Sequence, residues 1–312
     1  MCDINLSIVI PVFNELENLP QMIGRSLAAC RGMDRSFEII FVDDGSSDGS
    51  RHILREASLA NPEVKTLVLN RNYGQHAAIF AGLQASRGEI VITLDADLQN
   101  PPEEIPNLMQ EIEKGFDVVG TVRQNRQDTW FRRKSSALVN RTIQRATGVL
   151  MHDYGCMLRA YRRNVVDAML QCGEHSTFIP VLANSFAGST SEIPVKHDAR
   201  AAGDSKYGLL KLISLQFDLL TSMSTFPLRL LSLGGMFVSI LGIGLGVLLA
   251  VLRIYLGAAW AADGIFTLFA LLFVFIGAQF VGLGLLGEYI GRIYHDVRGR
   301  PRFLVKEVYS SK

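Results

Sequence analysis

Two long apolar segments near the end of this 312-residue chain constrain its fold more than any other feature. Residues 230–252 and 265–287 are almost wholly apolar, and each is long enough to cross a bilayer core of about 30 Å as a helix. The residues between them include Tyr255 and Trp260, which suit a membrane interface, and Arg253, whose charge can reach the headgroups. The sequence therefore predicts a transmembrane helical hairpin; a buried helix pair in a soluble protein is the alternative.

Charge is distributed unevenly around this hairpin. Basic residues gather on the side away from the connecting loop: Arg200, Lys206, Lys211 and Arg229 precede the first segment, and Arg292, Arg298, Arg300, Arg302 and Lys306 follow the second. Because loops rich in lysine and arginine stay in the cytoplasm, we expect both termini there. The early acidic residue Asp3 argues against a signal peptide. The net charge of +1 gives no reason to expect nucleic acid as a partner.

The first 120 residues alternate between short β-branched apolar runs and helical patterns. We expect strands at 6–11, 37–42, 64–69, 89–94 and 117–120, with helices at about 14–32, 75–86 and 102–114 and one that is capped by Ser47 or Asp48 and ends at Ala60. This order predicts a parallel sheet covered by helices, which binds ligands beyond the carboxyl ends of its strands. No G-x-G-x-x-G motif follows the first strand, so we do not expect a dinucleotide-binding dehydrogenase.

Acidic residues follow three of the expected strands: Glu15 the first, Asp43 and Asp44 the second, Asp95 and Asp97 the fourth. Parallel strands bring their carboxyl ends to one edge of the sheet, so these side chains should converge. In the segment 95–99 an extended chain would point Asp95, Asp97 and Gln99 in one direction. Such an oxygen-rich set suits Mg²⁺ or Mn²⁺ held together with the phosphates of a substrate. A solvated aspartate pair in a turn is the alternative.

A strongly basic segment follows the last of these strands. Between residues 123 and 145 seven basic residues stand against Asp128 alone: Arg123, Arg126, Arg132, Arg133, Lys134, Arg141 and Arg145. Trp130 and Phe131 lie among them, a mixture typical of a helix at a membrane surface that faces anionic headgroups. A solvated basic face with its aromatic residues in the core is the alternative.

Three of these segments resemble the motifs of GT-A glycosyltransferases of family 2. They are Ile10-Pro11-Val12-Phe13-Asn14-Glu15, Val42-Asp43-Asp44-Gly45-Ser46-Ser47-Asp48 and Leu94-Asp95-Ala96-Asp97-Leu98-Gln99. The string from Asp153 to Arg163 and the two apolar segments extend the resemblance to the polyprenyl-phosphate branch of that family, over essentially the whole chain. It implies an α/β, Rossmann-like GT-A domain with a mostly parallel sheet in the cytosol (1–205). An amphipathic juxtamembrane segment (206–229), two transmembrane helices (230–287) and a cytosolic tail (288–312) should follow.

The resemblance also implies roles for individual residues on the donor side. Pro11, Glu15 and Asp44 would hold the uracil and ribose of a UDP-sugar. Asp97, Gln99 and Asp95 would ligate Mg²⁺ or Mn²⁺ at the diphosphate, which Asp95 would also help to bind. A loop with Arg200, Ser205 and Lys206 would close over the diphosphate; a juxtamembrane linker is the alternative for that loop.

On the acceptor side, the resemblance implies undecaprenyl phosphate in a bacterial inner membrane. Its phosphate is mostly dianionic at pH 7, because the second pKa of a phosphate monoester lies near 6, so a strong base is not required. Besides Asp97, the candidate catalytic residues are Arg123, Arg126 and Asp153, and the candidate ligands of the lipid phosphate are Arg132, Arg133, Arg141 and Arg159. Asp153 would orient the phosphate or act as a base, although a structural pair with Arg159 explains both residues equally well.

Two further strings, 70–76 and 120–128, resemble the members of that branch that transfer 4-deoxy-4-formamido-L-arabinose. The resemblance implies an inverting transfer of this sugar from UDP to undecaprenyl phosphate, which feeds lipid A modification and polymyxin resistance. Transfer of glucose, mannose or another hexose is the alternative. Residues 302–308 alternate like a strand, and we expect them to dock on a neighbouring copy in a homo-oligomer.

Overall fold

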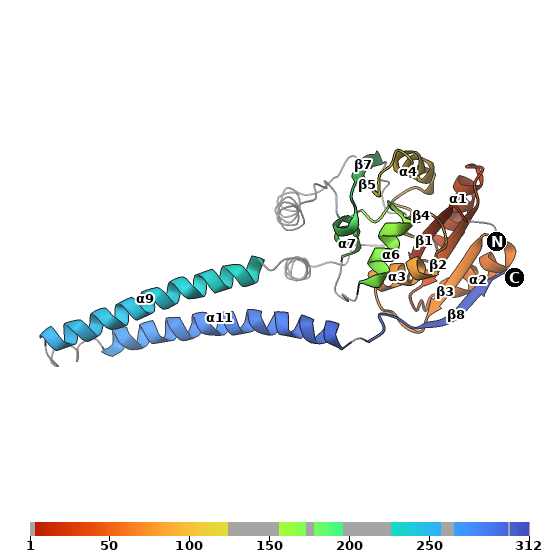
Figure 1. Ribbon diagram of the computed structural model, residues 1–312. Coiled ribbons are helices and arrows are strands. Elements are labelled where there is room, and N and C mark those ends of the chain that lie inside the picture. The colour runs from red at the N-terminus through yellow and green to blue at the C-terminus, as the bar shows by residue number, and fades with distance from the viewer. Residues whose placement is uncertain are drawn as a thin grey trace. The chain divides into compact units, whose positions relative to one another are not determined.

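The computed structural model describes residues 4–123, 156–172, 178–195, 226–256, 265–298 and 300–311. The chain divides into two compact units (Figure 1). One unit combines Met1–Ile213 with Gly299–Lys312, and the other is Ser214–Arg298, which contains the apolar hairpin. The C-terminal tail therefore belongs to the same unit as the N-terminal residues.

The centre of the first unit is a sheet built from apolar runs of the sequence. In the described part of the chain eight strands form this sheet, in the order β7-β5-β6-β4-β1-β2-β3-β8. β1 (Leu6–Val12) lies between β2 (Phe37–Asp43) and β4 (Ile90–Thr93) and runs parallel to both, and β3 (Val64–Leu69) continues the parallel order beside β2. The residues of β1, β2 and β4 are almost all buried, as expected of strands that helices cover on both faces.

Helices cover both faces of these strands. α1 (Leu19–Arg31), α2 (Ser50–Ala60) and α4 (Ile105–Ile112), which the short helix η1 (Pro102–Glu104) precedes, pack on the face that carries Leu6, Ile8 and Ile10. α3 (Gln75–Ala85) packs on the opposite face, where Val9 and Val91 point. Gly82 lets α3 lie directly on β1, because a Cβ there would overlap the side chain of Val9. These strands and helices lie within a few residues of the predicted positions.

The other half of the sheet contains strands that the sequence did not reveal. β5 (Val118–Arg123) was predicted, but β6 (Arg159–Arg162) and β7 (Thr190–Val195) were not. β6 runs antiparallel to β4 and β5, β5 runs parallel to β7, and the sheet is therefore mixed, with a parallel centre. α6 (Arg163–Gln171) and α7 (Ile179–Phe186) join α3 on its face of the sheet.

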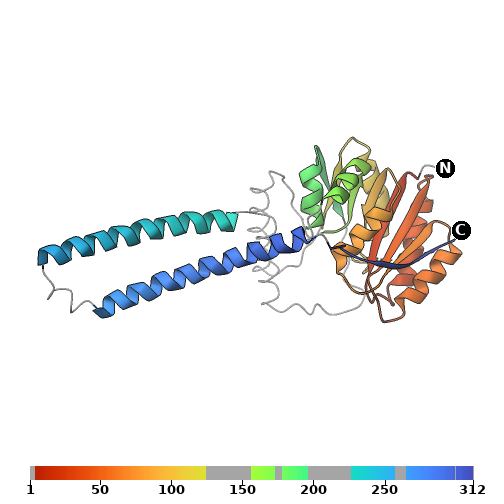
Figure 2. The ribbon, with the colours of Figure 1, turned by 60° about the horizontal axis from the view of Figure 1, so that its bottom comes forward.

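The last strand, β8 (Val305–Ser310), completes the sheet at the open edge of β3 (Figure 2). It pairs antiparallel with β3, from Lys65 opposite Ser310 to Leu69 opposite Val305. Its residues alternate between half-buried and exposed, as predicted for 302–308. In this structure the segment satisfies the backbone groups along the edge of its own sheet, while its docking on a neighbouring copy stays a prediction.

The described part of the second unit contains two long helices, α9 (Phe226–Leu256) and α11 (Ile265–Val297). By length and composition, residues Leu230–Leu256 and Val274–Gly291 are apolar enough to cross a membrane, and 0 % of either stretch is buried within the protein. The helices approach closely at Gly242, where a Cβ would lie 3.4 Å from the ring of Phe275. Both helices are longer than the predicted spans. In α11, polar residues such as Glu288 continue the helix beyond its apolar part.

Candidate active site

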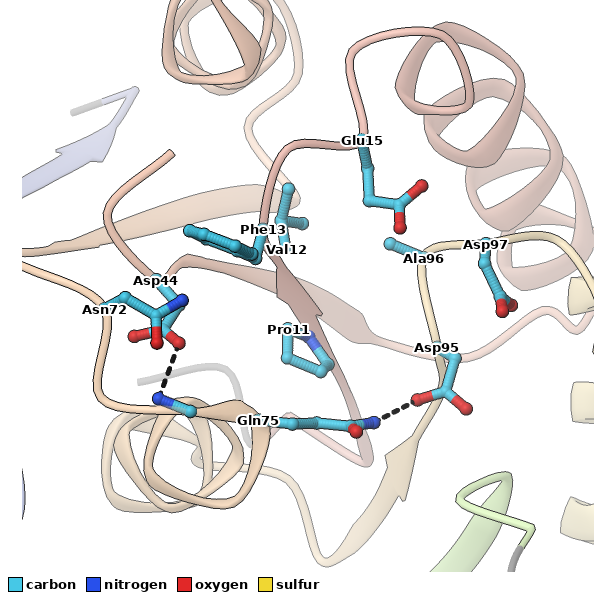
Figure 3. Close-up of a pocket in the computed structure, with 11 residues that line it drawn as sticks. Pro11, Val12, Phe13, Glu15, Asp44, Asn72, Gln75, Asp95, Ala96 and Asp97 are labelled. Atoms are coloured by element: carbon cyan, nitrogen blue, oxygen red, sulfur yellow. Dashed lines mark hydrogen bonds between the residues drawn. The ribbon is translucent and has the colours of Figure 1, made fainter. Parts of the chain in front are cut away.

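A pocket opens at the carboxyl ends of the central strands, where parallel sheets of this kind bind ligands (Figure 3). Its volume is about 340 Å³. The loops that follow β1, β2, β3 and β4 line it with Pro11, Val12, Phe13, Glu15, Asp44, Asn72, Gly74, Gln75, Asp95, Ala96 and Asp97. The structure thus brings together five residues that the sequence predicted as a group, namely Pro11, Glu15, Asp44, Asp95 and Asp97.

Hydrogen bonds between two loops fix the position of Glu15. The amide of Asn14 donates to Ser46 Oγ at 3.0 Å, and the amide of Ser47 donates back to Asn14 Oδ1 at 2.9 Å. Asn14 has a φ of 55°, a left-handed conformation that asparagine tolerates better than most residues. The next residue, Glu15, accepts a hydrogen bond from Asn18 Nδ2 at 2.6 Å and points into the pocket. Ser46 and Ser47 therefore hold the turn after β2 against the loop that carries Glu15.

Asp44 holds the loop between β3 and α3 in place. It is 2 % exposed, its Oδ1 accepts the amide of Tyr73 at 2.7 Å, and its Oδ2 accepts the amide of Gly74 at 2.8 Å. Burial raises the pKa of the Asp44 carboxyl, while the two amide bonds act in the opposite direction. Asp44 thus lines the pocket and also orders one of its walls.

Of the lining residues without a predicted role, Gln75, Asn72 and Phe13 bring an amide or aromatic side chain to the pocket. Gln75 donates from Nε2 to Asp95 Oδ1 at 2.6 Å, Asn72 lies beside Asp44, and Phe13 is 46 % exposed at the pocket. Asn72 and Gln75 belong to the string 70–76, which directly follows the third strand. Their position after the third strand was the available signal, because ligands bind at the carboxyl ends of parallel strands and amide side chains there can contact a ligand as acidic ones can.

The segment after β4 is not extended as predicted. β4 ends at Thr93, the chain then turns, and Leu98 has a φ of 61°. The amide of Gln99 donates to Asp97 Oδ1 at 3.1 Å, a bond that aspartate commonly makes in turns. In the described part of the chain, Asp95 and Asp97 line the pocket and Gln99 does not. The prediction that these three side chains point in one direction was wrong, because strand alternation stops where the turn begins.

The charge of the pocket fits a divalent cation bound together with an anion. Among the described lining residues there are four carboxylates and no lysine, arginine or histidine. The described residues contain no cluster of three or more His, Cys, Asp or Glu that would hold a metal ion by itself. Mg²⁺ is usually bound by one or two carboxylates plus the phosphates of a substrate, and the pair Asp95 and Asp97 matches that share of the ligands.

Arg159 lies elsewhere than predicted. It begins β6 opposite Thr93, it is 0 % exposed, and its Nε donates to the carbonyl of Cys156 at 2.9 Å. A fully buried guanidinium bonded to the backbone does not lie at a surface where a lipid headgroup arrives. The structure therefore contradicts the predicted role of Arg159 in binding a lipid phosphate, while the alternative pair with Asp153 stays a prediction, because Asp153 lies outside the described residues.

The remaining predicted residues are not part of the described site. Arg123 ends β5, and the structure describes only its backbone. Eight others lie outside the described residues: Arg126, Arg132, Arg133, Arg141, Asp153, Arg200, Ser205 and Lys206. Their roles stay predictions.

Known proteins share both the sequence and the fold of this chain. It is 60 % identical, over 304 residues, to the undecaprenyl-phosphate 4-deoxy-4-formamido-L-arabinose transferase of Edwardsiella ictaluri (strain 93-146), an alignment that covers 97 % of this chain and 94 % of the relative.

Two solved structures share the fold at low identity. Mannosyl-3-phosphoglycerate synthase from Rubrobacter xylanophilus is 15 % identical, with a TM-score of 0.54, and the match covers 74 % of this chain and 75 % of that chain. Glucosyl-3-phosphoglycerate synthase from Mycobacterium tuberculosis in complex with uridine-diphosphate is 16 % identical, with a TM-score of 0.50, and the match covers 70 % and 78 %. These likenesses confirm the predicted α/β fold of GT-A type.

The family assignment covers the whole pocket. The family model for glycosyl transferase family 2 matches residues 7–170, a range that contains β1 to β4 and the four loops that line the cavity. The chain belongs to glycosyl transferase family 2.

Proposed function

We infer that this glycosyltransferase transfers 4-deoxy-4-formamido-L-arabinose from its UDP-sugar to undecaprenyl phosphate. The observation that carries this inference is the 60 % identity to a transferase of that name, over 97 % of the chain. The identity extends over both the pocket and the apolar hairpin, so it includes the parts that would meet each of the two substrates.

The pocket offers suitable groups for a UDP-sugar. Carboxylate oxygens of Glu15 and Asp44 can accept hydrogen bonds from the uracil N–H and the ribose hydroxyls. Phe13 presents an exposed aromatic ring at the same end, a surface on which a base can stack. Asp95 and Asp97 would hold a divalent cation, Mg²⁺ or Mn²⁺, which offsets the charge of the diphosphate when it is bound.

The acceptor needs positioning more than activation. A phosphate oxygen of undecaprenyl phosphate forms a bond to the anomeric carbon, while the bond between that carbon and the UDP oxygen breaks, and no proton has to move. Attack from the face opposite UDP inverts the anomeric centre. Two anions must come together for this step, so cations are required. We assign that role to the basic segment 123–145, with Arg123, Arg126, Arg132, Arg133 and Arg141, and the orientation of the phosphate to Asp153.

The order of strands supports a membrane topology with both termini in the cytoplasm. β3 precedes the hairpin in the sequence and β8 follows it, yet the two strands pair in one sheet. A chain that leaves the sheet and returns to it must cross the membrane an even number of times. Two spans in the bacterial inner membrane meet this condition, and the pocket then faces the side where UDP-sugars are made.

The test is the mass of the lipid product. Purified full-length protein is incubated with undecaprenyl phosphate and either the UDP-formamido-arabinose or UDP-glucose, and the lipids are analysed by mass spectrometry. We expect formamido-arabinosyl phosphate lipid from the first donor alone. Product from UDP-glucose and none from the formamido sugar would overturn the assignment in favour of hexose transfer.

The cation requirement has a separate test on UDP binding. Asp97→Asn removes one negative charge, so UDP should bind the variant a few times more tightly than the wild type in EDTA, since one unit charge a few ångströms away contributes about 1 kcal/mol in a watery site. With Mn²⁺ present the order should reverse, because a metal ligand is lost. Asp167→Asn, an exposed carboxylate on α6, is the matched control. Turnover that survives complete chelation would contradict the role of the metal.

A further inference from the structure

Hydrogen bonds link the two ends of the pocket through the start of α3 (Figure 3). β2 and β4 are not neighbours, because β1 lies between them in the sheet. Asp44 after β2 accepts the amide of Gly74 at 2.8 Å, and the next residue, Gln75, donates to Asp95 after β4 at 2.6 Å. The first residues of α3 therefore bridge the loops of two strands that do not pair with each other.

The chemistry of Gln75 suits a carboxylate that must keep its charge. Elsewhere in the domain arginine side chains hold carboxylates: Arg87 bonds Glu38, Arg51 bonds Asp43, and Arg25 bonds Glu103. The carboxamide of Gln75 fixes one oxygen of Asp95 as closely as an arginine would, but it brings no positive charge. The Gln75 bond thus orients one oxygen of Asp95 without adding a positive charge.

Gln75 is exposed, so burial gives it little structural role. Ala78, Ile79 and Phe80, which follow in the same helix, are buried in the core and hold the helix on the sheet. Loss of the Gln75 side chain should therefore leave the fold of α3 intact. Loss of the hydrogen bond from Gln75 to Asp95 should therefore alter the pocket and not the packing of α3.

We propose that Gln75 is a positioning residue that orients the Asp95 carboxylate toward the cation and diphosphate of the donor and ties that end of the pocket, through Gly74 and Asp44, to the end that holds the nucleoside. This inference deepens the proposed function and rests on it. Residues that orient a metal ligand typically contribute 10- to 100-fold to metal affinity or activity.

The experiment measures Mn²⁺ binding to the full-length protein in the presence of UDP, by electron paramagnetic resonance, together with the thermal midpoint and turnover. Gln75→Ala should weaken Mn²⁺ binding about 10-fold or more and leave the thermal midpoint within a degree or so of wild type. Gln75→Lys can still donate to Asp95 but adds a charge, so it should also weaken Mn²⁺ binding. Gln84→Ala, an exposed glutamine on the same helix, is the matched control and should change neither quantity.

Unchanged Mn²⁺ affinity in Gln75→Ala would overturn the inference. A loss of turnover that follows a fall in the thermal midpoint, with Mn²⁺ binding intact, would also overturn it and make Gln75 structural. If the variant weakens Mn²⁺ binding while the wild type forms no formamido-arabinosyl lipid, the positioning role stands and the proposed function fails.

Discussion

Gly45 is the position at which one methyl group should disturb the pocket most. Its φ is +75°, and a Cβ there would lie 2.6 Å from the carbonyl carbon of Arg71 and 2.7 Å from the amide nitrogen of Asn72. Both are backbone atoms, so no side-chain rotation relieves the contact. The loops after β2 and β3 must separate by about 0.8 Å before the contact reaches the 3.4 Å of an ordinary one.

The cost of Gly45→Ala can be worked from this geometry. A residue with a Cβ in the left-handed region costs about 1–2 kcal/mol. Separation of the loops by that distance stretches the bonds from Tyr73 and Gly74 to Asp44, and loss of one such bond to a charged group costs about 1.5–3 kcal/mol. We expect destabilisation by about 2.5–5 kcal/mol, a fall in the thermal midpoint of roughly 5–20 °C for a domain of this size, and weaker UDP binding.

Two other glycines separate the causes. Gly115 has a φ of +108° and no described atom within 4 Å of the added Cβ, so Gly115→Ala carries the backbone strain alone, about 1–2 kcal/mol. Gly24 lies inside α1 with the same free space, and Gly24→Ala should stabilise the helix by about 0.5–1 kcal/mol.

Thermal unfolding of the detergent-solubilised protein, followed with a thiol-reactive dye, measures this series. Cys30 is 0 % exposed, and burial raises its pKa to about 12, so it reacts only when the sheet opens. UDP affinity is measured in parallel. If Gly45→Ala were no less stable than Gly115→Ala and bound UDP like the wild type, the close approach of the two loops would have no energetic consequence and the argument would be refuted.

Three further predictions concern the support of the site. Arg159→Met removes the hydrogen bond to the buried carbonyl of Cys156 and should cost about 1–3 kcal/mol of stability in chemical denaturation. The KM for the lipid acceptor should not change, and a raised KM would restore the role of Arg159 in binding the lipid phosphate. The hydrogen bonds from Arg25 lower the pKa of Glu103 below its usual 4.5, so this pair stabilises the fold above that pH and loses its effect as the pH falls through the lowered value. Glu103→Gln should therefore flatten the acid side of the thermal-midpoint profile. Arg302→Met removes a stacking contact on Phe80 and a bond to the backbone, and hydrogen exchange of the β8 amides should become several times faster.

The central half of the fold was predictable because burial leaves a strong pattern. β1, β2 and β3 are apolar runs of strand length, and each is followed by a helix. α1 and α2 each have one apolar face, whereas α3 is buried throughout residues 78–83. β6 was missed because its four residues include two arginines, Arg159 and Arg162, whose guanidinium groups donate to backbone carbonyls in contacts that a sequence does not display. β8 was recognised as a strand, but alternation of side chains tells which residues share a face and not which edge the strand joins.

The candidate site was predictable to the extent that strand order determines it. Glu15, Asp44 and Asp95 converge because parallel strands end at one edge of the sheet. The predicted orientation of Gln99 was wrong because its amide donates to Asp97 in the turn after β4, where the alternation of side chains along the strand ends. Gln75 was missed since its importance lies in a contact with a residue twenty positions away, and glutamine is too common at helix starts to indicate such a contact.

The distribution of charge explains why one chain would combine an acidic pocket with a basic segment. The four carboxylates among the described lining residues would repel a nucleoside diphosphate, so a divalent cation should strengthen donor binding by offsetting part of that charge. The acceptor is a second anion, and a second divalent ion beside the first would be repelled by it. Fixed arginines, as in residues 123–145, avoid this difficulty, because their charge is part of the chain and needs no carboxylates to hold it. On the proposed function, the pocket would take its positive charge from the cation that accompanies each donor, while the acceptor side would carry its own. Selectivity should follow from this division, since an anion that arrives at the pocket without a cation should bind more weakly than one that brings a cation.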